Sequence, residues 1–230
     1  MPDTDEDGSG GKANPPDRRS LFRSMAENFT SVYLTMLSII QGVALTDLAQ
    51  ITFSEHAHFT TVNYVEVATM LWSLVYIWNH FMGDALMTHW IPDLEDALLL
   101  FGTGVFELVA NHAIVASPAA WLATLAIMFL AWSGGTLYIR RQEELVVRDP
   151  FLMQLLRERT RPLLLQTLGG GILLGVLAIV CRMTDAGAHP NGAIALVAVT
   201  IAFAVSLVIG VISARFWRRV RRYALAGNRG

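Results

Sequence analysis

Cysteine, lysine and charge in general are scarce in this sequence. The single cysteine, Cys181, excludes an intramolecular disulfide framework and a cysteine-rich metal site. Only 16% of the 230 residues are charged, whereas a soluble domain usually carries about 25%. Arginines outnumber lysine sixteen to one, which suits a bacterium with a GC-rich genome. The glycine patterns of nucleotide-binding loops, the Cys/His spacing of zinc sites and the nucleophile elbow of hydrolases are also missing.

Long apolar runs fill the chain instead. After residue 28 they recur at lengths near the roughly 20 residues that cross a bilayer. We therefore predict an all-α, polytopic integral membrane protein, with six transmembrane helices in one bundle over residues 29–216. The polar residues 1–28 are predicted to be a disordered cytoplasmic segment, and residues 217–230 a basic cytoplasmic tail. The expected spans are 29–49, 62–82, 97–116, 119–139, 163–180 and 193–214.

Positive charges are confined to a few short segments. Residues 24–139 contain nine acids and no cation, whereas residues 140–230 contain thirteen arginines. Sixteen of the 17 cations lie in the N-terminal segment, in the loop between the fourth and fifth spans, and in the tail. Lys and Arg in short loops stay on the cytoplasmic side of a membrane, and even numbers of spans separate these segments. We therefore expect a multi-pass protein of the cell inner (plasma) membrane with both termini in the cytoplasm, and only Arg182 outside.

Two of the basic segments have the composition of membrane-surface helices. Asp149 and Pro150 are typical of an N-cap followed by a first helical residue. The apolar and basic residues after them predict a short interfacial helix between the fourth and fifth spans. The tail sequence RFWRRVRRYAL combines arginines with aromatic residues. Because both segments adjoin membrane spans, we expect them to bind anionic lipid headgroups rather than nucleic acid.

Ionisable residues inside the spans are concentrated in the N-terminal half of the chain. Such residues are costly within a bilayer and by default mark function. With about 100° of rotation per residue, the second span carries one polar stripe that is about 27 Å long. The stripe consists of Glu66, Thr69, Ser73, His80 and Asp84.

The third and first spans repeat this pattern more sparsely. Asp96, Thr103, Glu107 and Asn111 share one face of the third span, and Gln41 lies at the edge of a face of small polar residues in the first. We expect these stripes to face one another or a water-filled cavity. Glu107 lies ten residues into its span, and no cation occurs between residues 24 and 139 to neutralise it.

Simpler explanations compete for several of these residues. Asn63 with Glu66, and Asp93 with Asp96, have the spacing of capping boxes. His80 and Asp84 are one helical turn apart, so they can share a proton or hold a cation, but solvation at the inner interface is an alternative. The candidate transport or ion-binding site consists of Glu107, His80, Asp84, Glu66 as an outer acid, and Gln41 as a neutral lining group.

Small residues recur every four positions in the sixth span. They are Ala198, Ala202, Ser206, Gly210 and Ala214, and Gly171 and Gly175 have the same spacing in the fifth. This spacing lets another helix approach closely. The pattern favours a homo-oligomer, although it does not specify whether the contacting helix belongs to the same chain.

Three classes of function are consistent with these features. We favour a membrane channel or transporter for protons or cations, because acids without cations attract them and repel anions. The alternative is a non-catalytic sensor, adaptor or assembly module in which the polar stripes only hold helices together. An integral membrane metal-dependent enzyme is the weakest of the three, because His80, Asp84, His89 and His112 lack the close repeated spacing of metal ligands. We expect no cofactor, and the sequence specifies no metal.

Overall fold

The computed structural model describes residues 18–88, 94–146, 150–185 and 192–227, and within these ranges it contains helices and no strand. The prediction of an all-α protein is therefore confirmed. The elements are α1 (Arg18–Glu55), a short 3₁₀ turn η1 (His56–His58), α2 (Thr61–Thr88), α3 (Leu94–Ala116), α4 (Pro118–Val146), α5 (Pro150–Asp185) and α6 (Gly192–Gly227).

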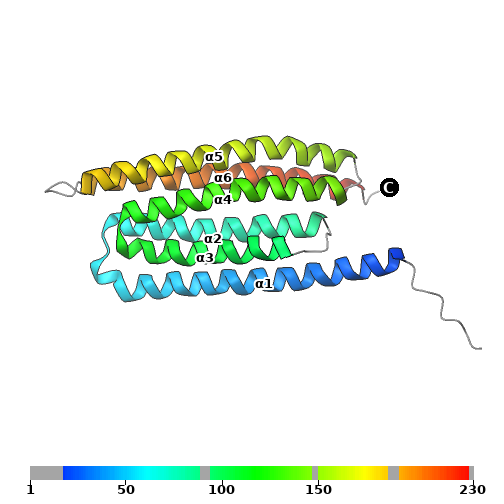
Figure 1. Ribbon diagram of the computed structural model, residues 1–230, viewed down its shortest axis with the longest axis horizontal. Coiled ribbons are helices and arrows are strands. Elements are labelled where there is room, and N and C mark those ends of the chain that lie inside the picture. The colour runs from blue at the N-terminus through cyan, green and yellow to red at the C-terminus, as the bar shows by residue number, and fades with distance from the viewer. Residues whose placement is uncertain (1–17, 89–93, 147–149, 186–191, 228–230) are drawn as a thin grey trace, which may run out of the picture.

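The six long helices form an up-and-down bundle in which consecutive helices run in opposite directions (Figure 1). α1 and α3 lie along one side, α5 and α6 along the other, and α2 and α4 lie between them. α2 contacts α1, α3, α4 and α6, so most of its surface is covered by protein. The beginning of α1 and the end of α6 lie at the same end of the bundle (Figure 1).

Five helical segments are long and apolar enough to cross a membrane, which indicates a multi-pass membrane protein. The expected span at 62–82 lies in α2, which is long enough at 28 residues but is not among the five. Its polar stripe lowers its hydropathy. The five segments are Asn28–His58, Ala97–Ala116, Pro118–Tyr138, Met153–Thr184 and Gly192–Tyr223.

Two helix boundaries differ from those expected from the sequence. α1 already begins at Arg18, inside the segment 1–28 that we expected to be disordered, and residues 1–17 lie outside the described residues. A separate interfacial helix between the fourth and fifth spans is not confirmed, because Pro150 opens α5 and the helix continues through Pro162 without a break. Leu155 and Leu156 are buried, so one face of this segment packs on protein.

The turn between α3 and α4 has the form that the sequence predicts. α3 ends at Ala116 and Pro118 is the first residue of α4, where a proline loses no helical hydrogen bond. The Ser117 hydroxyl accepts a hydrogen bond from the backbone N–H of Ala120 at 3.1 Å. Ser117 is therefore the N-cap of α4.

The small residues of α6 pack against another helix of the same chain. The Trp72 indole of α2 donates a hydrogen bond to the backbone carbonyl of Ser206 at 3.1 Å. A Cβ added at the buried Gly210 would lie 2.6 Å from the Trp72 ring, so the glycine makes room for this tryptophan. The pattern behind the expected homo-oligomer thus has a partner within the chain, and the homo-oligomer stays a prediction.

Candidate functional site

The polar stripe of α2 is buried along its whole length. Its five residues are spaced at helical intervals, so they project from one side of the helix, and that side faces the other helices of the bundle. The exposed fractions are 0% for Glu66, 1% for Thr69, 8% for Ser73, 1% for His80 and 1% for Asp84. A buried charged group requires partners: Arg159 of α5 is the partner of His80 and Asp84, and the partner of Glu66 is Asn63 of α2 itself.

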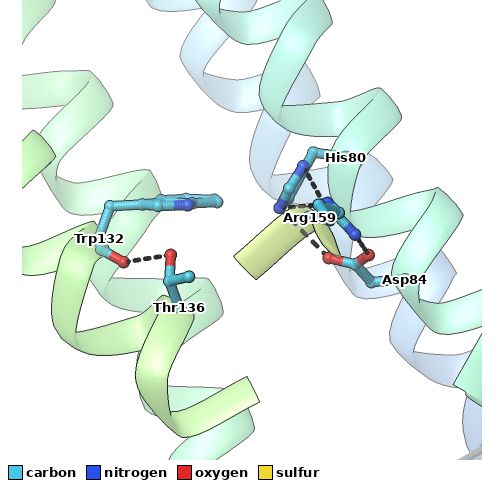
Figure 2. A network of polar contacts seen from close by, with 5 residues as sticks. All are labelled: His80, Asp84, Trp132, Thr136 and Arg159. Atoms are coloured by element: carbon cyan, nitrogen blue, oxygen red, sulfur yellow. Dashed lines mark hydrogen bonds and ion pairs between the residues drawn. The ribbon is translucent and has the colours of Figure 1, made fainter. Parts of the chain in front are cut away.

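Asp84 and His80 bind an arginine that comes from α5 (Figure 2). The Arg159 guanidinium donates through Nη1 to Asp84 Oδ1 at 2.7 Å. Its Nη2 lies 2.8 Å from His80 Nδ1 and 3.0 Å from Nε2, and His80 Nε2 lies 3.2 Å from Asp84 Oδ2. One tautomer satisfies both neighbours of the histidine: Nε2–H donates to Asp84, and Nδ1 accepts from Arg159.

Aromatic rings enclose this cluster on two sides. The guanidinium carbon of Arg159 lies 4.7 Å from the centroid of the Phe216 ring and 5.1 Å from that of Trp217, both on α6. The His80 ring lies 5.5 Å from the Trp132 ring of α4, as Figure 2 shows. The Arg159 side chain is only 10% exposed. The cluster therefore joins α2, α4, α5 and α6 in a poorly solvated place.

Arg159 is the residue that the sequence analysis missed. We assigned it to a cytoplasmic loop, but it lies in α5 and its side chain reaches into the bundle. Its position on the helix is the signal that the sequence analysis overlooked. Leu155, Leu156 and Thr160 mark the buried face of α5, and Arg159 lies on that face because it follows Leu155 by one helical turn. Asp84 is thus neutralised by a cation from the C-terminal half of the chain, and the same cation donates to His80.

Glu107 of α3 is fully buried and is held by a neutral side chain of α1. The Gln41 amide Nε2 lies 2.8 Å from Glu107 Oε1 and 2.9 Å from Oε2. Glu107 is 0% exposed and Gln41 8%. Among the described residues Glu107 has no other hydrogen-bond partner and no cation beside it. This pair brings together two of the residues that the sequence nominated.

Glu66 is the second buried carboxyl with a neutral partner. Its Oε2 accepts a long hydrogen bond of 3.4 Å from the Asn63 amide, and within the described part of the chain its Oε1 has no partner. Asn63 also donates to the Ile114 carbonyl of α3 at 3.0 Å. The proposed capping box of Asn63 and Glu66 is wrong, because α2 begins at Thr61 and Asn63 accepts from the N–H of Thr60 instead.

A further polar group joins α1 and α3 one turn beyond Glu107. The Asn111 amide donates to the Ala44 carbonyl at 2.9 Å and to Asp47 Oδ2 at 3.0 Å. His112 Nε2 lies 3.3 Å from Asp47 Oδ1, and the His112 side chain is 67% exposed. Asp47 of α1 therefore contacts two residues of α3.

The enzyme interpretation receives no support from this geometry. His112 pairs with Asp47 and His80 with Asp84 and Arg159, while His89 and Asp93 lie outside the described residues. Within the described ranges, no group of three His, Cys, Asp or Glu side chains could hold a metal ion.

A small cavity adjoins the arginine cluster. It measures about 20 Å³ and lies between α2, α4 and α5, where His80, Asp84, Thr136 and Arg159 line it. A space of 10–15 Å³ holds one water molecule. The cavity therefore has room for a single water beside the ion pair.

Comparison with known proteins does not assign this arrangement to a family. No family model, curated protein or solved structure matches the chain. The chemistry of the site is therefore inferred from its own residues. Asp84, Arg159 and His80 form one buried cluster, and the carboxyls of Glu66 and Glu107 are buried elsewhere in the bundle with uncharged amides as partners.

Proposed function

We propose that this chain is a membrane channel or transporter for protons or cations, with its polar pathway along α1, α2 and α3. The observation that carries the proposal is the environment of Glu107 and Glu66. Both carboxyls are 0% exposed, and their hydrogen-bond partners among the described residues are the amides of Gln41 and Asn63. Burying an acid without a cation costs stability, so an ionisable residue inside a membrane span by default indicates a functional role.

The residues around these acids suit protons better than hydrated ions. Asp, Glu and His side chains within spans form proton relays, and hydroxyl groups extend such a relay because they donate and accept hydrogen bonds. Buried hydroxyls of this kind, Thr69, Ser73 and Thr103, occur on α2 and α3. Those of Thr69 and Thr103 donate to backbone carbonyls of their own helices, and their oxygens remain able to accept a hydrogen bond. His80, Asp84 and the adjoining one-water cavity mark the end of the stripe at which α5 begins.

Six spans with both termini in the cytoplasm are part of this proposal. α2 contacts α1, α3, α4 and α6 and lies inside the bundle (Figure 1), so a membrane that contains the five apolar helices contains α2 as well. The helix ends that carry most arginines are the start of α1, the end of α4, the start of α5 and the end of α6, and they lie together at one end. The positive-inside rule assigns that end to the cytoplasm, and in a bacterium the membrane is the inner membrane.

A second candidate function is a non-catalytic membrane module. It is favoured by a specific observation, namely that the buried polar contacts connect different helices. Gln41 joins α1 to α3, Asn63 joins α2 to α3, and Arg159 joins α5 to α2. Interhelical hydrogen bonds of this kind stabilise bundles without any transport role.

Substitution of Glu107 by glutamine separates these two functions. Glu107→Gln keeps the shape of the side chain and its ability to bond Gln41, but it removes the ionisable group. The purified protein is reconstituted into liposomes, and flux of protons and of monovalent and divalent cations is measured beside thermal unfolding. A pathway predicts loss of flux with intact folding, whereas the exposed control Glu158→Gln keeps wild-type flux. Full flux in a well-folded Glu107→Gln protein contradicts the pathway, and absence of flux in the wild type favours the module.

A further inference from the structure

A second cavity, distinct from the polar stripe, opens between α5 and α6. Its volume is about 240 Å³, far more than the 10–15 Å³ that a water molecule needs. Its lining residues lie between positions 155 and 166 of α5 and between 209 and 219 of α6, toward the end of the bundle where α5 begins and α6 ends (Figure 1). That end is the one at which the arginines of α5 and α6 gather.

The lining of this cavity changes from basic to apolar along the bundle. The rings of Phe151 and Tyr223 stack at 4.2 Å and fix the antiparallel register of α5 and α6. In this register the basic residues lie nearer the helix ends and the apolar ones nearer the middle of the bundle. The basic part is lined by Arg159, Arg215 and Arg219 beside Leu155, Glu158 and Phe216, and the apolar part by Leu163, Ile209 and Ile212 beside Gln166.

The basic part carries positive charge that the described residues do not neutralise. Arg159 is already bound to Asp84, but Arg215 and Arg219 are exposed and have no acidic partner among the described residues. Glu158 also lines the cavity and carries one negative charge, which its hydrogen bond from the neutral Gln154 amide at 3.0 Å does not remove. The two arginines outnumber this one acid, so the lining stays positively charged. Two arginines are therefore available to an anion that enters the cavity.

We propose that this cavity is a binding site for an anionic phospholipid. Arg215 and Arg219 bind its phosphate, and the first part of an acyl chain follows the apolar wall toward the middle of the membrane. Basic pockets between membrane helices on the cytoplasmic side have the chemistry that anionic headgroups require, and the change from basic to apolar lining matches the polarity of a lipid. The inference rests on the membrane location of the chain and not on transport.

Native mass spectrometry of the full-length protein in detergent tests the site. The probes are phosphatidylglycerol, phosphatidylcholine with the same acyl chains, and inorganic phosphate. Each arginine near an anionic headgroup contributes about a factor of five in affinity, so R215Q/R219Q should bind phosphatidylglycerol about 30-fold more weakly. The control R221Q/R222Q removes the same charge from exposed positions of α6 that do not line the cavity, and it should bind like the wild type.

Four results overturn the proposal, the last of them from a further variant. Equal losses in both double variants mean that phosphatidylglycerol binds by diffuse surface charge. Equal binding of phosphatidylcholine and phosphatidylglycerol means that the headgroup charge has no role. If inorganic phosphate, at the concentration used for phosphatidylglycerol, displaces that lipid, the ligand is a soluble phosphate. If R215Q/R219Q unfolds, Ile212→Trp is used instead, because it fills the apolar part of the cavity without changing the charge. This variant should no longer bind phosphatidylglycerol, and continued binding of the lipid overturns the proposal.

Discussion

Removal of the Arg159 guanidinium should destabilise the whole bundle. Arg159→Gln leaves the Asp84 carboxylate, which is 1% exposed, without the cation that lies 2.7 Å from it. Breaking a buried ion pair by deleting one partner costs about 3–5 kcal/mol. The contacts of the guanidinium with the Phe216 and Trp217 rings contribute about 0.5–2 kcal/mol more, and the remaining contact of Asp84 with His80 offsets part of the loss. We therefore expect the free energy of unfolding to fall by about 3–5 kcal/mol.

Equilibrium unfolding of the purified full-length protein in mixed micelles measures this change. Arg157→Gln is the matched control, because Arg157 lies two residues earlier on α5 and is exposed. Its effect should stay within about 0.5 kcal/mol, as for most surface substitutions. The comparison separates the buried contact from the general loss of one positive charge.

A double-mutant cycle assigns the effect to the pair. Asp84→Asn in the Arg159→Gln background removes the unpaired buried charge, so the double variant should be more stable than Arg159→Gln alone. We expect a coupling free energy of about 2–3 kcal/mol, near the upper end of the range for residues in contact. Additive effects, or an Arg159→Gln protein within about 1 kcal/mol of wild type, would refute the reasoning that this ion pair is buried and tight.

Two further predictions concern packing and topology. Gly210→Leu should lower the free energy of unfolding by about 1–3 kcal/mol through overpacking, because a Cβ there lies 2.6 Å from Trp72. The control Gly134→Leu, where nothing lies within 4 Å, should unfold like the wild type. Equal losses of stability in the two variants would mean that α6 does not pack on α2. Reporter fusions within residues 53–60 and after Gly227 should report opposite compartments, since the two sites lie at opposite ends of the bundle (Figure 1); the same compartment for both would rule out an even number of spans.

Burial of the polar stripe was predictable from the sequence because it depends on a local property. The rotation per residue of a helix is fixed, so the side chains from Glu66 to Asp84 share a face whatever their surroundings. The same reasoning aligned Thr103, Glu107 and Asn111 on α3, and all three are buried. Helix period thus locates a polar face without any knowledge of neighbours.

The partners of that face could not be predicted, because they depend on contacts between distant segments. Arg159 reaches Asp84 only because α5 continues through Pro162 and packs its first turns on the bundle. The apolar and basic residues that follow Pro150 are typical of a helix on a membrane surface, which is why the sequence favoured a separate surface helix. The small residues of α6 posed the same difficulty: their spacing predicts close packing but not that α2 supplies the partner.

The Arg159 contact also has a consequence for biosynthesis. Arg159 is made 75 residues after Asp84, and chains fold from the N-terminus as they emerge. α2 is therefore synthesised, with Glu66, His80 and Asp84 on its buried face, before the cation that neutralises Asp84 exists. It is also the long helix that lies outside the five apolar segments. Stable insertion of α2 should accordingly wait until α5 has been made. In a nascent chain that ends after α4, α2 should be weakly packed, and α5 and α6 should then complete the assembly of the first four helices.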